Sequence, residues 1–263
     1  MKDFEIAIAA ADAGAAVVRS RFRTPMGRID KGSNDFATDA DVESERAIIA
    51  VIQRERPEDA IVGEETGQSG PTKAARRWLI DPLCGTQNYA VGTSIVAVNV
   101  ALRSGYDTLA AAVAEPFSDE VLWTDGVVAR ARAGDRDTDL IPDGASRIID
   151  LSIDTPWPNA PALRTTALGG DPAFTKRFEP RVLSTTLALA WVASGRRAAY
   201  MTDGDVRSSV HFAAGLAVCQ AARCVVTDLR GRPWHESGKG IIAAADGETH
   251  ETLVNMVRRF LQE

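Results

Sequence analysis

The chain has 263 residues, 45% of them hydrophobic and 25% charged, with a net charge of −6 at pH 7 and a pI near 5.2. This size and composition suit a globular protein with one sizeable domain or two halves that share a core. The acidic balance argues against a large nucleic-acid interface. No apolar run reaches the roughly 18 residues that a membrane-spanning helix needs.

The N-terminal sequence and the cysteines predict a cytoplasmic protein. Residues 1–5 lack the basic region and the apolar stretch of a signal peptide. The three cysteines cannot all pair and show no zinc-finger spacing, so we expect reduced thiols. Cys219 and Cys224 fall on an apolar helix and strand and are expected in the core.

The first half of the chain predicts two helices followed by buried strands. An Ala-rich amphipathic helix over 3–21 and a helix over 38–56 flank a turn-rich piece at 31–35. Strands are expected, in chain order, at 60–63, 78–81, 93–103, 107–115 and 121–124. An Arg/Asp-rich stretch up to residue 147 predicts a surface hairpin and loop.

The second half alternates between the two kinds of element. Strands are expected at 163–168, 198–201, 224–228 and 241–244, and helices at 185–194, 210–222 and 249–262. This order predicts layered helices and sheets, an α/β fold, without fixing the topology.

Three segments have the order and spacing of known motifs. Residues 78–89 read W-L-I-D-P-L-C-G-T-Q-N-Y, residues 63–66 read G-E-E-T, and residues 210–215 read V-H-F-A-A-G. They resemble the W-x-I-D-P-x-D-G-T-x-N-F, G-E-E and W-D-x-A-A-G motifs of the inositol monophosphatase family, and the resemblance covers nearly the whole chain. Cys84 and His211 depart from it, because they stand where the family has metal-binding aspartates.

The resemblance implies the fold and the way the protein works. It predicts a five-layer α-β-α-β-α sandwich formed by residues 1–263 as a single domain. The halves would be about 1–150 and about 151–263, with the active site between them. It also implies a homodimer that acts on a small phosphorylated molecule. The acidic balance and the lack of a long apolar run predict no nucleic-acid or membrane partner.

Carried over by position, the family's first metal site is complete. It predicts that Glu64, Asp81 and the backbone carbonyl of Leu83 hold one Mg²⁺, with Glu65 as a secondary candidate. Oxygen ligands are what Mg²⁺ requires. Taken without the resemblance, an acidic pair such as Glu64-Glu65 after a strand is a solvated turn.

Asp41 and Thr86 have two interpretations. At the start of a helix, Thr38 and Asp41 form a capping arrangement. The family's motif instead uses the equivalents of Asp41 and Thr86 to orient the attacking water. A cap does not exclude this catalytic role.

Cys84 and His211 leave three alternatives open. With Asp81 they offer three ligands and an open position, the stoichiometry of catalytic Zn²⁺. Alternatively, Cys84 is a nucleophile with His211 as its base, and no metal is needed. The third alternative is decay of the site, which leaves a buried thiol and a satisfied histidine.

Substrate contacts are expected at two places. Gly85 and Thr86 follow a strand where the backbone can approach an anion. Residues 181–186 resemble the family's R-x-x-G-[ST]-A segment, which makes Ser184 and Thr185 substrate-binding candidates, although either could instead cap the next helix. Asp205 lies near the family's substrate-binding acid, but its surroundings could equally be only a turn.

These observations predict a divergent hydrolase of a cyclitol, sugar or nucleotide monophosphate, with one Mg²⁺ and an altered second metal site. Ordinary two- or three-magnesium phosphatase activity is not expected. One alternative is a fold diverted to metal-independent acyl, amide or other group transfer by Cys84 and His211. Another is a ligand-binding protein without catalysis.

Overall fold

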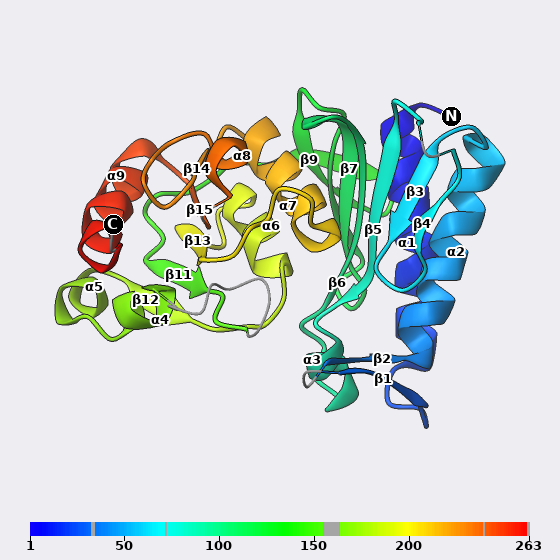
Figure 1. Ribbon diagram of the computed structural model, residues 1–263, viewed down its shortest axis with the longest axis horizontal. Coiled ribbons are helices and arrows are strands. Elements are labelled where there is room, and N and C mark those ends of the chain that lie inside the picture. Colours follow the sequence, from blue (N-terminus) through cyan, green and yellow to red (C-terminus); the bar gives the residue numbers. More distant parts are fainter. Residues whose placement is uncertain (33–34, 72, 155–163, 239, 262–263) are drawn as a thin grey trace. The chain divides into compact units, whose positions relative to one another are not determined.

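The structure is a computed structural model that describes residues 1–32, 35–71, 73–154, 164–238 and 240–261 (Figure 1). Its chain forms two compact units. Unit 1 comprises Met1–Asp139, Thr185–Leu187 and Val210–Val218, and unit 2 comprises Leu140–Ser184, Ala188–Ser209 and Cys219–Glu263.

Unit 1 is built on an eight-stranded sheet with the strand order β10-β9-β8-β7-β6-β5-β3-β4. The strands are β3 (Ala60–Gly63), β4 (Gly67–Ser69), β5 (Arg77–Cys84), β6 (Ala97–Ser104), β7 (Asp107–Glu115), β8 (Glu120–Thr124), β9 (Ala129–Ala133) and β10 (Arg136–Asp139). Neighbouring strands are antiparallel, except that β3 and β5 run parallel. The carboxyl ends of β3 and β5 therefore lie at the same edge of the sheet.

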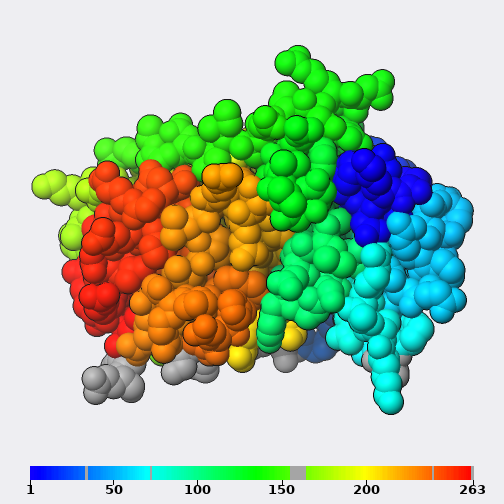
Figure 2. All heavy atoms as spheres, turned by 90° about the horizontal axis from the view of Figure 1, so that it is seen from above, coloured from blue at the N-terminus to red at the C-terminus, as the bar shows by residue number. Residues whose placement is uncertain are grey.

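Two long helices cover one face of this sheet, α1 (Asp3–Arg21) and α2 (Asp39–Glu55). They lie side by side in Figures 1 and 2 and contact each other and the central strands. Their apolar sides and the inner residues of the strands form one buried core. Gly14 allows the close approach, because a Cβ there would lie 2.8 Å from the side chains of Ser44 and Ile48. A hairpin of β1 (Arg28–Gly32) and β2 (Asp35–Thr38) leads into α2.

Unit 2 has a five-stranded sheet with the order β12-β11-β13-β15-β14 and its own apolar core. The strands are β11 (Ile148–Leu151), β12 (Glu179–Arg181), β13 (Ala199–Thr202), β14 (Val225–Thr227) and β15 (Ile241–Ala244). The helices of the second half of the chain are α4 (Arg164–Gly169), α5 (Pro172–Arg177), α6 (Leu187–Ala193), α7 (Val210–Ala221), α8 (Trp234–Ser237) and α9 (Gly247–Val257), the last followed by a 3₁₀ turn at Arg258–Phe260.

The mixed α/β class is confirmed, and most predicted elements lie within a few residues of their expected bounds. One prediction is wrong: residues 164–168 belong to a helix, α4, and not to a strand. The reason is a distant residue, because the carboxylate of Asp203 accepts the first backbone N–H groups of this helix, from Arg164 and Thr165. Leu163 and Gln262, which were expected to begin and end elements, lie outside the described residues.

Five short strands were not expected from the sequence: β1, β2, β4, β11 and β12. The predicted surface hairpin is confirmed as β9–β10. Among the described residues, none of the helices combines the length and the apolarity that crossing a membrane requires.

Candidate functional site

The end of β5 and the turn after β3 bring the predicted acidic residues together. Gly63 pairs with Ile80 across the parallel strands, and the N–H of Glu64 continues this ladder by donating to the Ile80 carbonyl at 3.1 Å. Asp81 follows Ile80 directly and is fully buried. The parallel pairing thus places two carboxylates at one sheet edge.

The chain then turns sharply into a short helix, α3 (Thr86–Ala90). The pairing of β5 with β6 is irregular between Asp81 and Cys84, and the backbone N–H of Leu83 donates to Asp81 Oδ1 at 3.2 Å. Gly85 has a φ of 104°, a left-handed conformation that favours glycine. This turn directs Asp81, Cys84 and Thr86 toward the same region of unit 1.

Asp41 and Thr86 form the predicted pair, and the predicted capping arrangement coexists with it. The Thr86 hydroxyl donates to Asp41 Oδ1 at 2.9 Å. The other oxygen of Asp41 accepts the backbone N–H of Thr38 at 2.8 Å and its hydroxyl at 2.6 Å. Burial raises the pKa of Asp41 despite these hydrogen bonds. One carboxylate therefore caps α2 and holds Thr86.

Asp81, Cys84 and His211 form a compact cluster. His211 Nδ1 lies 2.7 Å from Asp81 Oδ2, and one ligand atom from each of the three residues lies within 4.8 Å of the others. Burial alone would raise the pKa of Asp81, but the charge of His211 and its hydrogen bond lower it. Conversely, Asp81 raises the pKa of His211 well above its ordinary value although burial opposes this. Without a metal ion, the two residues form an ion pair.

The thiol of Cys84 is buried and hydrogen-bonded. Its Sγ accepts the backbone N–H of Thr186 at 3.1 Å and lies 2.9 Å from the Thr186 hydroxyl. Burial, with the negative charge of Asp81, raises the pKa of the Cys84 thiol. A raised pKa is the opposite of what a nucleophilic cysteine needs.

Glu64 and Glu65 share a cation that sequence reasoning missed. Lys31, on the β1–β2 hairpin, places its ammonium 2.9 Å from Glu64 and 2.7 Å from Glu65. Burial and the charge of Asp81 raise the pKa of Glu64 to about 8. Glu64 and Asp81 therefore need a positive charge nearby if both are to be ionised. Nothing in the sequence around Lys31 indicated a role at the site, because the residue lies in a segment whose composition predicts only a turn.

Glu45 is a second residue that sequence reasoning missed. It is fully buried on α2, and its carboxylate accepts the N–H groups of Glu65 at 2.9 Å and Thr66 at 2.8 Å. A Cβ on Gly63 would lie 2.5 Å from this carboxylate, so glycine is required there. The signal was its spacing, because Glu45 follows Asp41 by four residues and so shares its helix face.

Asn99 is the third missed residue. It lies opposite Asp81 in the β5–β6 ladder, and its Nδ2 donates to Asp81 Oδ2 at 3.4 Å and to Thr186 Oγ1 at 3.1 Å. The signal was an amide within an apolar run that predicts a buried strand.

The predicted substrate residues separate into the two units. Thr185, in unit 1, donates through its hydroxyl to the Cys84 carbonyl at 3.0 Å. Ser184 and Asp205 lie in unit 2, where Ser184 donates to Asp154 at 2.8 Å and Asp205 pairs with Arg207 at 2.5 Å. Ser184 has a φ of 50°, which favours the glycine usual at this position of the family's motif.

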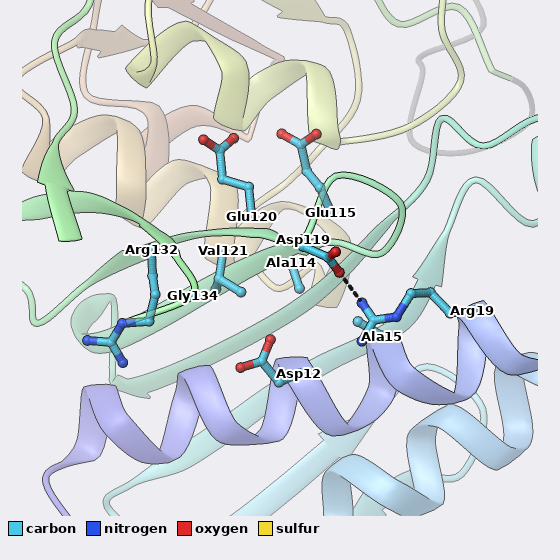
Figure 3. A pocket seen from close by; sticks show the side chains of 10 residues that line it. All are labelled: Asp12, Ala15, Arg19, Ala114, Glu115, Asp119, Glu120, Val121, Arg132 and Gly134. Atoms are coloured by element: carbon cyan, nitrogen blue, oxygen red, sulfur yellow. Dashed lines mark ion pairs between the residues drawn. The ribbon is translucent and has the colours of Figure 1, made fainter. Parts of the chain in front are cut away.

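A separate small cavity of about 170 Å³ contains none of these residues (Figure 3). It lies between α1 and the β7–β9 part of the sheet, where Arg19 pairs with Asp119 at 3.4 Å. Its lining mixes acidic and basic side chains: Asp12, Arg19, Glu115, Asp119, Glu120 and Arg132. The candidate metal ligands and the Asp41–Thr86 pair therefore lie elsewhere in unit 1.

Comparison with known proteins supports the resemblance found in the sequence. Residues 2–262 match the sequence model of the Inositol monophosphatase family. The chain is 28% identical over 250 residues to inositol-1-monophosphatase ImpA of Mycolicibacterium smegmatis, covering 88% of this chain and 83% of the relative. It is 30% identical over 260 residues to Nus factor SuhB of Salmonella typhimurium, and this match covers 95% of this chain and 94% of the relative.

The fold agrees as well. An IMPase structure from Thermotoga maritima matches with a TM-score of 0.81 and 22% identity, covering 98% of this chain and 96% of that one. This confirms the predicted fold. ImpA and a fructose-1,6-bisphosphatase/inositol-1-monophosphatase of Aquifex aeolicus, 40% identical over 124 residues and covering 46% of this chain and 47% of the relative, bear the names of phosphatases of small phosphorylated molecules. The chain belongs to the inositol monophosphatase family.

Proposed function

We propose that this protein is a metal-dependent hydrolase of a small phosphate monoester, a cyclitol, sugar or nucleotide monophosphate. The observation that carries the proposal is the Thr86–Asp41 hydrogen bond of 2.9 Å, in the same unit as the fully buried carboxylate of Asp81 and the partly buried carboxylate of Glu64. The first group of residues can orient a water molecule, and the second can hold a cation. A metal-dependent hydrolysis of such an ester uses both.

We further propose that Glu64, Asp81 and the Leu83 carbonyl hold one Mg²⁺. The donors fit a hard ion, because they are two carboxylates and a carbonyl. The fit also has an electrostatic basis, since the charge of Asp81 adds to burial in raising the pKa of Glu64 to about 8. The Leu83 carbonyl lies 3.2 Å from the Thr86 hydroxyl, but the one hydrogen of that hydroxyl goes to Asp41 at the shorter distance of 2.9 Å, so the carbonyl oxygen keeps lone pairs for the ion. When bound, the ion would supply positive charge to the phosphoryl oxygens and lower the pKa of a bound water.

Thr86 and Asp41 would orient the water for in-line attack. Because the Thr86 hydroxyl donates its hydrogen to Asp41, its oxygen is left to accept a hydrogen from the water. As the water attacks phosphorus, the bond from phosphorus to the ester oxygen breaks, and the departing alcohol oxygen takes up a proton from solvent. The proton of the attacking water can pass to Thr86 Oγ1 while the Thr86 proton passes to Asp41 Oδ1. The raised pKa of Asp41 favours this transfer. Lys31 would have to leave Glu64 to make room for the cation.

The test is phosphate release from a panel of cyclitol, sugar and nucleotide monophosphates, with Mg²⁺, Zn²⁺ and EDTA in parallel. We expect release with metal and none with EDTA. The same preparation carrying Asp41→Asn controls for contaminating phosphatases. Release that persists in EDTA, or none with any substrate and ion, contradicts the proposal.

A second candidate is a protein that binds a partner or ligand without turnover. It is favoured by the replacement of two metal-binding aspartates by Cys84 and His211, and by a relative at 30% identity that bears the name Nus factor. Thermal stabilisation by a phosphorylated compound without phosphate release would favour this candidate.

A Cys84 nucleophile is the weakest of the three hypotheses. Its thiol is buried, its pKa is raised, and His211 Nδ1 faces Asp81. Alkylation of Cys84 faster than that of an ordinary thiol near neutral pH would revive it. Homodimer formation, cytoplasmic localisation and a single functional domain over residues 1–263 stay predictions, the first of them checked by light scattering.

A further inference from the structure

We propose that Asp81, Cys84 and His211 form a Zn²⁺ site, distinct from the Mg²⁺ ligand set in its chemistry. The ion would be held by a carboxylate oxygen, a thiolate and an imidazole nitrogen, with a fourth position open. The inference rests on the proposed function, since this ion would take the place of the family's second metal.

The positions of the three side chains suit one ion. The ligand atoms come from the end of β5 and from the start of α7, and they lie within 4.8 Å of one another. Tetrahedral Zn²⁺ with bonds of about 2.0–2.3 Å needs ligand separations of roughly 3.3–3.6 Å. Asp81 Oδ2 and His211 Nδ1 lie 2.7 Å apart as hydrogen-bond partners, so these two side chains would have to separate slightly to admit the ion between them. His211 has 27% of its side chain exposed, which leaves a side open for a water or a substrate oxygen.

A second set of groups orients these ligands. The backbone N–H and the hydroxyl of Thr186 lie at 3.1 and 2.9 Å from Cys84 Sγ, and N–H donors favour a thiolate. Asn99 and the Leu83 N–H fix the two oxygens of Asp81 at 3.4 and 3.2 Å. Such outer contacts usually accompany metal ligands.

Asn99 also offers an independent observation. It is fully buried, and its Oδ1 has no hydrogen-bond partner within the described part of the chain. An unpartnered amide oxygen costs free energy at a buried position, and a metal-bound water or a shift of its neighbours on metal binding would satisfy it.

The identity of the ion follows from the donors. Sulfur and nitrogen replace two oxygens, and this change favours Zn²⁺ over Mg²⁺. One thiolate and one carboxylate carry two negative charges, which balance one divalent ion. Binding would release the Cys84 thiol proton and the proton that His211 carries beside Asp81, and both would pass to solvent.

The experiment uses the full chain, freed of metal with a chelator and titrated with Zn²⁺ against a chelating dye. We expect one Zn²⁺ per chain. Co²⁺ in its place should give an absorption band from sulfur-to-cobalt charge transfer, which reports the Cys84 bond without any substrate. Cys84→Ser should remove the band and weaken Zn²⁺ binding about 10–100-fold or more.

Matched variants keep the test independent of folding. Cys219→Ser removes another buried thiol, whose Sγ donates to the Leu189 carbonyl, and should leave both the band and the affinity unchanged. His211→Ala should weaken Zn²⁺ binding while the far-ultraviolet circular dichroism stays that of the wild type. A Co²⁺ band that survives Cys84→Ser, or an apo chain that binds no Zn²⁺, overturns the inference.

The two proposals fail separately. Mg²⁺-dependent phosphate release from a chain that binds no Zn²⁺ would overturn the zinc site and leave the hydrolase. Zinc binding that depends on Cys84, without phosphate release under any condition, would support the zinc site and remove the hydrolase.

Discussion

Asp41 shows how one buried side chain can carry a structural and a chemical role. Oδ2 accepts two hydrogen bonds from Thr38 at the start of α2, and Oδ1 accepts the hydroxyl of Thr86. A capping carboxylate and a proton acceptor need the same thing, a fixed oxygen close to a donor. The two interpretations of this residue from the sequence are therefore compatible.

Substituting Asp41→Asn should lower kcat for phosphate release by about 10²–10⁴-fold, because the amide cannot accept the proton that Thr86 relays. Thr86→Ser keeps the hydroxyl and should retain most of the activity, whereas Thr86→Ala should not. Steady-state kinetics and circular dichroism of the three variants are the measurements. Equal activity of Thr86→Ala and Thr86→Ser would show that the Thr86 hydroxyl does not relay a proton to Asp41.

The double substitution Cys84→Asp/His211→Asp should convert the site to an all-oxygen magnesium site. A carboxylate about 4 Å from a divalent ion contributes several kcal/mol at an effective dielectric of about 20. We expect the half-saturating Mg²⁺ concentration to fall at least about tenfold, since about 1.4 kcal/mol already gives that factor. Activity titrations with Mg²⁺ measure it, with each single substitution as control. An unchanged Mg²⁺ requirement would mean that these positions do not face a cation.

At the scale of elements, the turn after β3 depends on α2, the helix that precedes β3 in the chain. Glu45 on α2 accepts two N–H groups of this turn, and Gly63 leaves the room that the Glu45 carboxylate fills. This turn also places Glu64 beside Asp81. The conformation of the G-E-E motif therefore depends on a side chain of α2.

Gly63→Ala should destabilise the protein by about 1–3 kcal/mol, because the new methyl group overpacks against a buried carboxylate. Gly247→Ala is the matched control: nothing lies within 4 Å of a Cβ there, and its change should be close to zero. Urea unfolding of both variants measures the difference. Equal stability of the two variants would contradict the tight contact with Glu45.

The loop after β14 provides a test of pH dependence away from the site. Asp228 is buried, and it accepts the N–H groups of Arg230 and Arg232 at 2.8 Å each and the hydroxyl of Ser237 at 2.7 Å. Burial alone would raise the pKa of Asp228, but these bonds lower it. A lowered pKa stabilises the fold above the unfolded value of 3.8, and this stability is lost as the pH falls through the lower folded value.

Asp228→Asn should therefore cost about 1–3 kcal/mol at pH 7 and much less near pH 3, where the wild-type carboxyl begins to take up a proton. Urea unfolding at both pH values measures this. Asp135→Asn, at an exposed turn, should show no such change with pH. A cost for Asp228→Asn that is equal at both pH values would show that the charge of Asp228 is unimportant.

Across the whole chain, the residues that the motifs single out in unit 1 lie close together, but several residues that contact them were not expected. The spacing of Glu64 and Asp81 is informative because β3 and β5 are parallel neighbours, so residues at both strand ends must meet. Lys31, Glu45 and Asn99 were missed because each reaches the site from an element whose own sequence pattern signals only a turn, a helix or a buried strand.

The second half of the chain was harder to predict for a physical reason. Strands β11 and β12 have four and three residues, too few for a period of two to stand out. Helix α4 is six residues long and is capped by Asp203, nearly forty positions away, so no local signal marks its start. The strongly periodic and apolar segments, such as α2 and β7, were predicted within a few residues.

The most direct test of the central claim is phosphate release by a single preparation before chelation, after chelation, and after Mg²⁺ is added back. The account predicts hydrolysis that disappears with the chelator and returns with Mg²⁺, and that Asp41→Asn lacks throughout. Hydrolysis that chelation leaves untouched, or a complete absence of hydrolysis with every substrate and ion, would contradict it.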